Sequence, residues 1–235
     1  MLLCFGSFIM MPSVGVAMCD VDHRGEPVFV SRGGIKLEHA LAATGLDVAG
    51  RRALDVGAST GGFTDCLLQR GAAGVIAVDV GYGQLDWGLR NDPRVTVLER
   101  VNARTLSGEM LPYTPDLATV DVSFISLAKV LPAVLACLAE TYDALAMVKP
   151  QFEVGRALAS KGRGVIRDPA DRRGALVGVG EAALGLGSSV LGYHSSGLAG
   201  PKGNKETFVW LAEPGRAGAA QNMEEIEMMA RKVEP

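Results

Sequence analysis

The chain has few of the residues that mark several classes of protein. Only four cysteines occur among 235 residues, and no two of them form a C-x-x-C pair. The three histidines are scattered, so neither residue type shows the spacing of a zinc site, and we predict no bound metal. Cys66 and Cys137 lie within apolar helical patterns, which favours buried thiols and a reducing, cytoplasmic setting.

An excess of positive charge is also missing. Lysine and arginine total 23 against 26 aspartate and glutamate residues, for a formal net charge of −3. This balance disfavours a protein coated in positive charge for nucleic acid. Any contact with RNA must therefore come from a local basic surface.

The chain has one long apolar run, MLLCFGSFIMMPSVGVAM, at its start. The first cation is Arg24, so the run lacks the basic region of a secretory signal. It is short for a spanning helix, and Gly6, Pro12 and Gly15 interrupt it. We therefore expect residues 1–27 to be a poorly ordered leader, or the product of a misplaced start codon. No stable membrane insertion is expected.

From Val28 onward, strand patterns alternate with helical patterns. Continuous apolar segments such as GVIAVDV are typical of parallel strands that are covered on both faces. Strands are predicted at 51–56, 74–80, 95–99, 116–124 and 143–150, helices after Ser31 and at 61–71 and 127–138, and a closing strand pair at 189–196 and 206–212.

These elements predict an α/β fold with a doubly wound, mostly parallel sheet and an antiparallel hairpin at one edge. We place this domain at residues 28–215. The tail, residues 216–235, contains QNMEEIEMMARKV, which is typical of a short amphipathic helix.

The segment LDVGASTGGF, residues 54–63, leads from a predicted strand through a glycine-rich turn into a helix. Glycines allow close approach of the backbone to a ligand, and a helix N-terminus offers free N–H groups. Asp79, on the next strand, is placed to accept hydrogen bonds from ribose hydroxyls. The spacing differs from G-x-G-x-x-G, which disfavours an NAD-type dehydrogenase. The segment therefore indicates another adenosine-containing cofactor.

The stretch from Gly155 to Arg173 carries six cations and two aspartates. Clustered arginine and lysine residues bind phosphates well, so one interpretation is contact with an RNA backbone. A solvated surface loop is the other interpretation, and the sequence leaves both open. The cations are Arg156, Lys161, Arg163, Arg167, Arg172 and Arg173.

With these motifs in place, the chain resembles the TlyA (haemolysin A) group of FtsJ-like methyltransferases. DVGASTGGF and VDVGYGQL resemble that group's first motifs, and SRGGIKL, NARTL, DVSFISL, VKPQFE and GPKGNKETF follow the family's order across about residues 28–212. Many FtsJ relatives have proline where this loop has Thr60. The resemblance implies a Rossmann-like fold, S-adenosylmethionine as cofactor, and methylation of ribose 2′-hydroxyls in ribosomal RNA or ribosomal subunits.

The resemblance also implies a Lys–Asp–Lys–Glu set at Lys36, Asp121, Lys149 and Glu206. A ribose hydroxyl is a poor nucleophile, so the protein must align it and stabilise the developing alkoxide. We expect Lys149 to do this as a cation or as a base, oriented by Asp121. The positive charge of Lys36 would favour the neutral amine of Lys149, whereas the carboxylates of Asp121 and Glu206 would favour its ammonium. The sequence leaves this balance open.

Further contacts follow from the same motifs. Cofactor contacts are expected at Gly57, Ser59, Gly61, Gly62, Phe63, Asp79, Asn102 and Asp121, and RNA contacts at Arg156, Lys161, Arg163 and Arg167.

Two alternatives remain open. TlyA proteins usually begin with an S4-type RNA-binding domain, and we see nothing like it before Val28. The chain could therefore bind S-adenosylmethionine and RNA with little catalysis. A haemolysin-like, membrane-active protein is the second alternative, supported by the apolar leader alone.

Overall fold

The computed structural model describes residues 28–234, so the leader predicted at 1–27 lies outside the described residues. Seven strands form one sheet in the order β3-β2-β1-β4-β5-β7-β6. Their bounds are β1 (Arg52–Val56), β2 (Gly74–Asp79), β3 (Val95–Glu99), β4 (Leu117–Val120), β5 (Asp143–Val148), β6 (Ser189–Ala199) and β7 (Lys205–Ala212).

The first five strands are parallel, and β7 runs antiparallel to both β5 and β6. This arrangement confirms the predicted doubly wound α/β fold with its antiparallel closing hairpin. The second strand of that hairpin, β7, lies inside the sheet, and β6 forms the edge. Strand β4 ends at Val120, four residues earlier than predicted, so residues 121–124 form a loop.

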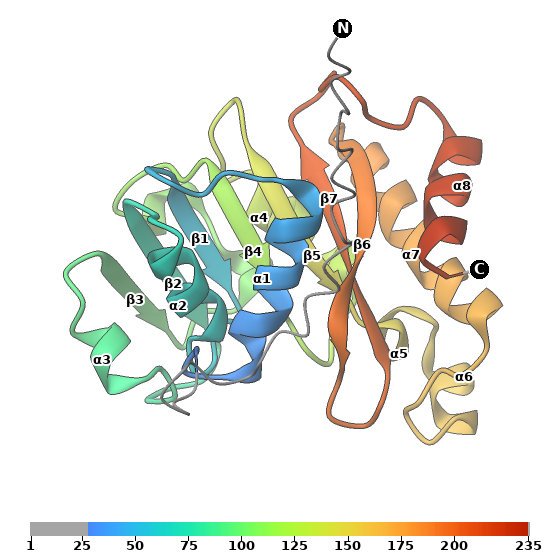
Figure 1. Ribbon diagram of the computed structural model, residues 1–235, viewed down its shortest axis with the longest axis horizontal. Helices are drawn as coiled ribbons and strands as arrows, with labels where there is room; N and C mark the ends of the chain where they lie inside the picture. The colour runs from blue at the N-terminus through green and yellow to red at the C-terminus, as the bar shows by residue number, and fades with distance from the viewer. Residues whose placement is uncertain (1–27, 235) are drawn as a thin grey trace, which may run out of the picture.

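Helices cover both faces of the sheet (Figure 1). On one face lie α1 and α2, and on the other lie α4 and α7, with α8 packed against α7 and β6. Their bounds are α1 (Arg32–Thr44), α2 (Gly62–Gln69), α3 (Trp87–Arg90), α4 (Leu131–Leu135), α5 (Pro150–Glu153), α6 (Arg156–Lys161), α7 (Pro169–Gly185) and α8 (Met223–Val233).

Local sequence explains where two of these helices begin. The Ser31 hydroxyl caps α1 by accepting a hydrogen bond from the Gly33 amide, as expected for a helix that starts after a serine. The single helix predicted at 127–138 was wrong. A 3₁₀ turn (Leu127–Lys129) precedes α4, and Pro132 lies in the first turn of α4, where its missing N–H leaves no helical hydrogen bond unmade.

The sheet is buried on both faces, as its continuous apolar strands predicted. Leu54 and Val56 face the α4–α7 layer, whereas Ala53 faces α1 and α2. Cys66 and Cys137 are free thiols within these two cores, which confirms the prediction of buried cysteines. Alternate residues of one strand therefore support opposite layers.

The segments that follow the strands gather at one edge of the sheet. The parallel strands end at the lower edge in Figure 1, where α3, α5, α6 and the loop between β6 and β7 also lie. In open α/β sheets ligands bind outside the carboxyl ends of the strands. We therefore expect the ligand site at this edge of the sheet.

Candidate active site

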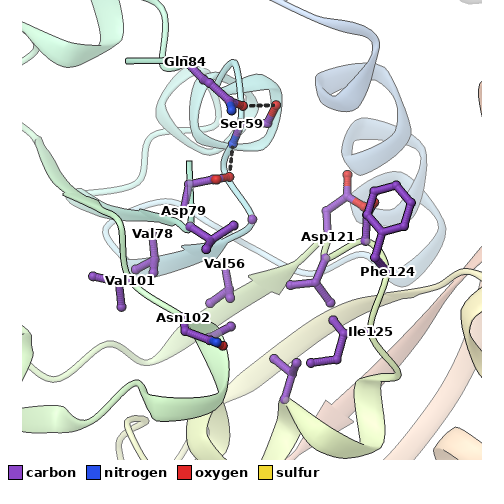
Figure 2. Close-up of a pocket in the computed structure, with 16 residues that line it drawn as sticks. Val56, Ser59, Val78, Asp79, Gln84, Val101, Asn102, Asp121, Phe124 and Ile125 are labelled. Atoms are coloured by element: carbon purple, nitrogen blue, oxygen red, sulfur yellow. Dashed lines mark hydrogen bonds between the residues drawn. The ribbon is translucent and has the colours of Figure 1, made fainter. Parts of the chain in front are cut away.

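A cavity of about 500 Å³ opens at the carboxyl ends of β1, β2 and β4. Figure 2 shows its walls, with Asp79 and Asn102 facing Asp121 and Phe124 across the opening. Val78 and Ile125 contribute apolar surface, and polar groups stand at the rim. Such a mixture of apolar walls and few polar groups is typical of a pocket for a small organic ligand.

The Asp79 carboxylate is held in place by the loop that follows β1. One of its oxygens accepts a hydrogen bond from the Ser59 amide at 2.8 Å (Figure 2), and the other accepts from the Gly81 amide at 2.6 Å. Each carboxylate oxygen keeps a further lone pair. Asp79 can therefore accept hydrogen bonds from two neighbouring hydroxyls of a ribose. Gln84, which the sequence analysis missed, lies beside Ser59 on the same rim.

Gly57 lies where the loop after β1 crosses the loop after β4. Its φ is +89°, and a Cβ atom there would lie 2.6 Å from the Asp121 carbonyl oxygen. Any other residue would need both a left-handed backbone and a shift of β4's end. Gly57 therefore fixes the distance between the two loops that form this pocket.

Three of the predicted cofactor residues lie elsewhere. Gly61, Gly62 and Phe63 are buried and do not line the pocket. A Cβ at Gly62 would lie 2.2 Å from Ser31 Oγ, and the Phe63 ring packs against Phe208. Gly62 thus allows α2 to approach the start of α1, and Gly61 allows the loop to approach Leu85 and Leu89. Direct contact of the three with a cofactor stays a prediction.

Asp55 lies beneath the same loop and was not predicted as a site residue. It is fully buried and accepts hydrogen bonds from the Thr64 hydroxyl at 2.7 Å and the Thr119 hydroxyl at 3.0 Å. Burial, with a smaller contribution from the nearby Asp121, raises the pKa of Asp55 to about 7 against the lowering effect of the two hydroxyls. The sequence could have indicated this residue, because Asp55 is a carboxylate within an otherwise apolar strand.

A second cavity, of about 800 Å³, holds the four predicted reacting residues. Lys36 comes from α1, Asp121 from the loop after β4, Lys149 from the end of β5, and Glu206 from β7. Lys149 Nζ lies 2.6 Å from Asp121 Oδ1 and donates to Ser123 Oγ at 2.9 Å. Lys36 Nζ donates to Glu206 Oε2 at 2.5 Å. The structure therefore brings the four together as two ion pairs.

The pairing limits what each lysine can do. An ammonium has three N–H donors; Lys149 donates one to Ser123 Oγ, and at most one more serves its ion pair with Asp121. One donor stays available for a ligand oxygen in the cavity. The formal charges of the two pairs cancel, so the net positive charge of the cavity lining comes from Arg163 and Lys202.

The two cavities meet at Asp121, Ser123 and Phe124, which line both. Phe124 has a left-handed backbone, with φ +64°, and its side chain is 91% exposed. Its ring lies 5.2 Å from that of Phe152 between centroids. A bulky residue in this conformation at a cavity junction is a strained feature of the kind found at functional sites. The sequence analysis placed Phe124 in a strand and missed this role.

Among the described residues, 28–234, no group of three or more histidine, cysteine, aspartate or glutamate side chains could hold a metal ion. None of the helices in that range is both long and apolar enough to cross a membrane.

Comparison with known proteins identifies the family. The family model described as FtsJ-like methyltransferase matches residues 29–213. The chain is an FtsJ-like methyltransferase. The 16S/23S rRNA (cytidine-2′-O)-methyltransferase TlyA of Mycobacterium tuberculosis is 52% identical over 201 residues, which cover 85% of this chain and 75% of the relative.

Solved structures agree with this assignment. A Lactococcus lactis protein solved as a candidate hemolysin has a TM-score of 0.79 at 42% identity, covering 88% of this methyltransferase and 99% of that chain. An S-adenosylmethionine-dependent methyltransferase from Mesorhizobium loti has a TM-score of 0.55 at 17% identity, covering 78% and 100%. This second likeness concerns the fold alone.

An FtsJ-like methyltransferase requires S-adenosylmethionine, and the residues present fit it. The Asp79 carboxylate can accept from the ribose hydroxyls, and the apolar walls suit an adenine ring. Asp121 Oδ1 is buried and makes no hydrogen bond besides its ion pair with Lys149. A cofactor amine or hydroxyl can satisfy it, so the first cavity suits the cofactor and the second suits the methyl acceptor.

The four cations predicted to bind RNA are exposed, and they line three different cavities. Arg163 lines the lysine cavity together with Lys202. Arg156 lines a neighbouring cavity with Arg104 and Lys129, which the sequence analysis missed. Lys161 and Arg167 lie around a smaller hollow.

Arg172, counted with these cations in the sequence, is buried and donates to Glu234 Oε2 at 2.7 Å. Its guanidinium is therefore part of the methyltransferase interior. Its partner lies 62 residues further along the chain, and nothing near Arg172 in the sequence indicates burial.

Proposed function

We propose that this methyltransferase transfers the methyl group of S-adenosylmethionine to a ribose 2′-hydroxyl of ribosomal RNA, free or within a ribosomal subunit, in the cytoplasm. One observation carries the proposal: the adenosine-type cavity and the lysine cavity share Asp121, Ser123 and Phe124. Methyl transfer needs donor and acceptor in contact, and this junction brings them together. The substrate named for the Mycobacterium tuberculosis relative supports the choice of RNA and of oxygen.

Lys149 is the group we assign to the acceptor oxygen. S-adenosylmethionine supplies an electrophilic methyl group on a sulfonium, so the protein has to orient the hydroxyl and stabilise negative charge as its proton leaves. The free N–H donor of Lys149 can hold the 2′-oxygen, while Asp121 and Ser123 fix the direction of the amine. Lys36 and Glu206 line the same cavity as a second ion pair.

Phe124 is placed to bind the base of the acceptor nucleotide. Its exposed ring stands at the junction of the cavities, and aromatic rings bind unstacked bases by stacking. An enzyme that modifies a nucleotide within folded RNA has to remove it from its stack. The left-handed backbone of Phe124 keeps the ring exposed before RNA arrives.

The basic side chains around these cavities can hold the RNA backbone. Arg163 and Lys202 flank the lysine cavity, and Arg104, Lys129 and Arg156 flank its neighbour. Phe124 and Phe152 line both of these cavities, so the cations stand on two sides of the aromatic pair. Local cations thus offset the negative net charge of the whole chain.

The test is methyl transfer from labelled S-adenosylmethionine to ribosomal subunits that lack the modification, followed by digestion and detection of 2′-O-methyl nucleosides. Lys149→Ala should abolish transfer, and Lys232→Ala, the same change on the exposed side of α8, should leave it unchanged. Transfer to a base instead of a ribose would refute the reaction. Cofactor binding without transfer would favour the binding protein with little catalysis.

A further inference from the structure

Arg163 has a strained backbone on the wall of the lysine cavity. Its φ is +53°, a conformation that residues other than glycine rarely adopt, and Gly164 follows with φ +82°. Arg163 is exposed and lines the same cavity as Lys36 and Lys149. A strained residue persists only where the surrounding structure holds it. The segment 163–167 must therefore be held in place by contacts with other parts of the protein.

Asn204 fastens this segment from the loop between β6 and β7. Asn204 is 2% exposed. Its oxygen accepts a hydrogen bond from the Ile166 amide at 2.9 Å, and its nitrogen donates to the Gly164 carbonyl at 2.7 Å. Both ends of one amide are used, so Asn204 fixes the backbone on each side of Val165.

Arg172 and Glu234 fasten the same segment from the other side. The Arg172 guanidinium is buried and donates to the carbonyls of Ile166 at 3.2 Å and Arg167 at 2.5 Å. Glu234, 2% exposed, accepts from Arg172 at 2.7 Å. A buried guanidinium needs an opposite charge, and Glu234 supplies it from the residue that follows α8.

We propose that Asn204 and the Arg172–Glu234 pair are positioning residues for RNA binding. They hold the segment 163–167 so that Arg163 meets a phosphate next to the acceptor nucleotide. Arg172 and Glu234 are buried and act through Arg163. A segment that is ordered before binding loses less conformational entropy when the RNA binds. The inference rests on the proposed function and deepens it, because it connects the helix farthest along the chain to substrate affinity.

The test compares Glu234→Gln with Glu227→Gln. Both variants remove one carboxylate at α8, but Glu227 is exposed and its nearest cation, Arg231, is 3.9 Å away. Glu234→Gln should raise KM for ribosomal subunits about tenfold, the effect of losing one well-placed charged contact. Its kcat and its Kd for S-adenosylmethionine should stay within about twofold of wild type. Glu227→Gln should change none of these values.

A double variant separates positioning from general stability. Arg163→Ala alone should raise KM, and adding Glu234→Gln should raise it no further, because Glu234 acts through Arg163. Additive effects, or an unchanged KM in Glu234→Gln, would overturn the inference. If Glu234→Gln does not fold, Asn204→Asp keeps the acceptor for Ile166 and loses the donor to Gly164, and it should give the same pattern.

Hydrogen exchange makes the result independent of catalysis. In Glu234→Gln, the amides of residues 165–167 should exchange faster than in wild type and in Glu227→Gln, with the protein alone in solution. Unchanged exchange at these amides overturns the positioning role. The proposed function fails separately, if wild-type protein transfers no methyl group to ribosomal subunits.

Discussion

Replacing Asp55 by asparagine tests whether burial or hydrogen bonding decides the charge of this residue beneath the loop that follows β1. Burial raises the pKa of Asp55 from 3.8 to about 7, although two threonine hydroxyls donate to the carboxylate. Each hydroxyl bond to a charged group contributes about 1.5–3 kcal/mol, and the desolvation of a fully buried carboxylate exceeds both together. The neutral carboxyl is therefore the folded form at acidic pH.

The effect on stability has a definite sign. The unfolded chain ionises Asp55 near pH 3.8, and the folded protein does so near about 7. The stability that this residue contributes is thus fully present below pH 3.8 and is lost as the pH rises to about 7. The difference between the two pKa values corresponds to about 4 kcal/mol. Asparagine has the shape of the neutral carboxyl and does not ionise.

Urea denaturation from about pH 4.5 to about pH 8.5 measures this effect. The free energy of unfolding of Asp55→Asn, minus that of wild type, should increase by about 3 kcal/mol across this range and level off above pH 7, because about 1 kcal/mol is already lost at the acidic end. Asp47→Asn, the same change at an exposed position, is the control. A difference that stays constant or falls with pH would mean that Thr64, Thr119 and the N-terminus of α2 hold Asp55 charged.

Three further substitutions test other parts of the structure. Gly57→Ala should abolish binding of S-adenosylmethionine in calorimetry, because its Cβ would lie 2.6 Å from the Asp121 carbonyl oxygen; normal binding would mean that the two loops separate freely. Phe124→Asn should lower kcat/KM for RNA about tenfold while thermal stability stays equal or rises, since asparagine tolerates φ +64°; a fall in Tm would contradict this. Asp143→Asn should lower the free energy of unfolding by about 2 kcal/mol, because Asp143 pairs with Arg51 and Arg216, and should leave cofactor binding unchanged at the opposite edge of the sheet.

Most of the fold could be predicted from the sequence because buried parallel strands and their helices have distinct periodicities. The position of β7 could not, since the alternation of two strands does not say which one pairs with β5. The end of β4 was also misplaced, because DLATVDVSF is apolar enough to continue as a strand. The chain turns at Asp121 instead.

Parts of the site could be predicted from local motifs, whereas other parts depend on residues far away in the sequence. The two lysines and two carboxylates stand in recognisable motifs, and the structure places them in one cavity. Contact of Gly61 and Gly62 with a ligand stays a prediction, because a glycine-rich turn has the same sequence whether it faces a ligand or neighbouring side chains. The strain at Phe124 and the burial of Arg172 depend on distant partners, and neither is visible in local sequence.

The place of β7 inside the sheet also determines when the lysine cavity forms during synthesis. Lys36 and Glu206 are 170 residues apart, and β7 pairs with β5 and β6 only after residue 212 has left the ribosome. Contacts of such long sequence separation form late, because the intervening chain has to be ordered first. The adenosine-type cavity, built on β1, β2 and β4, can assemble earlier. A nascent chain thus completes the adenosine-type cavity before it completes the lysine cavity.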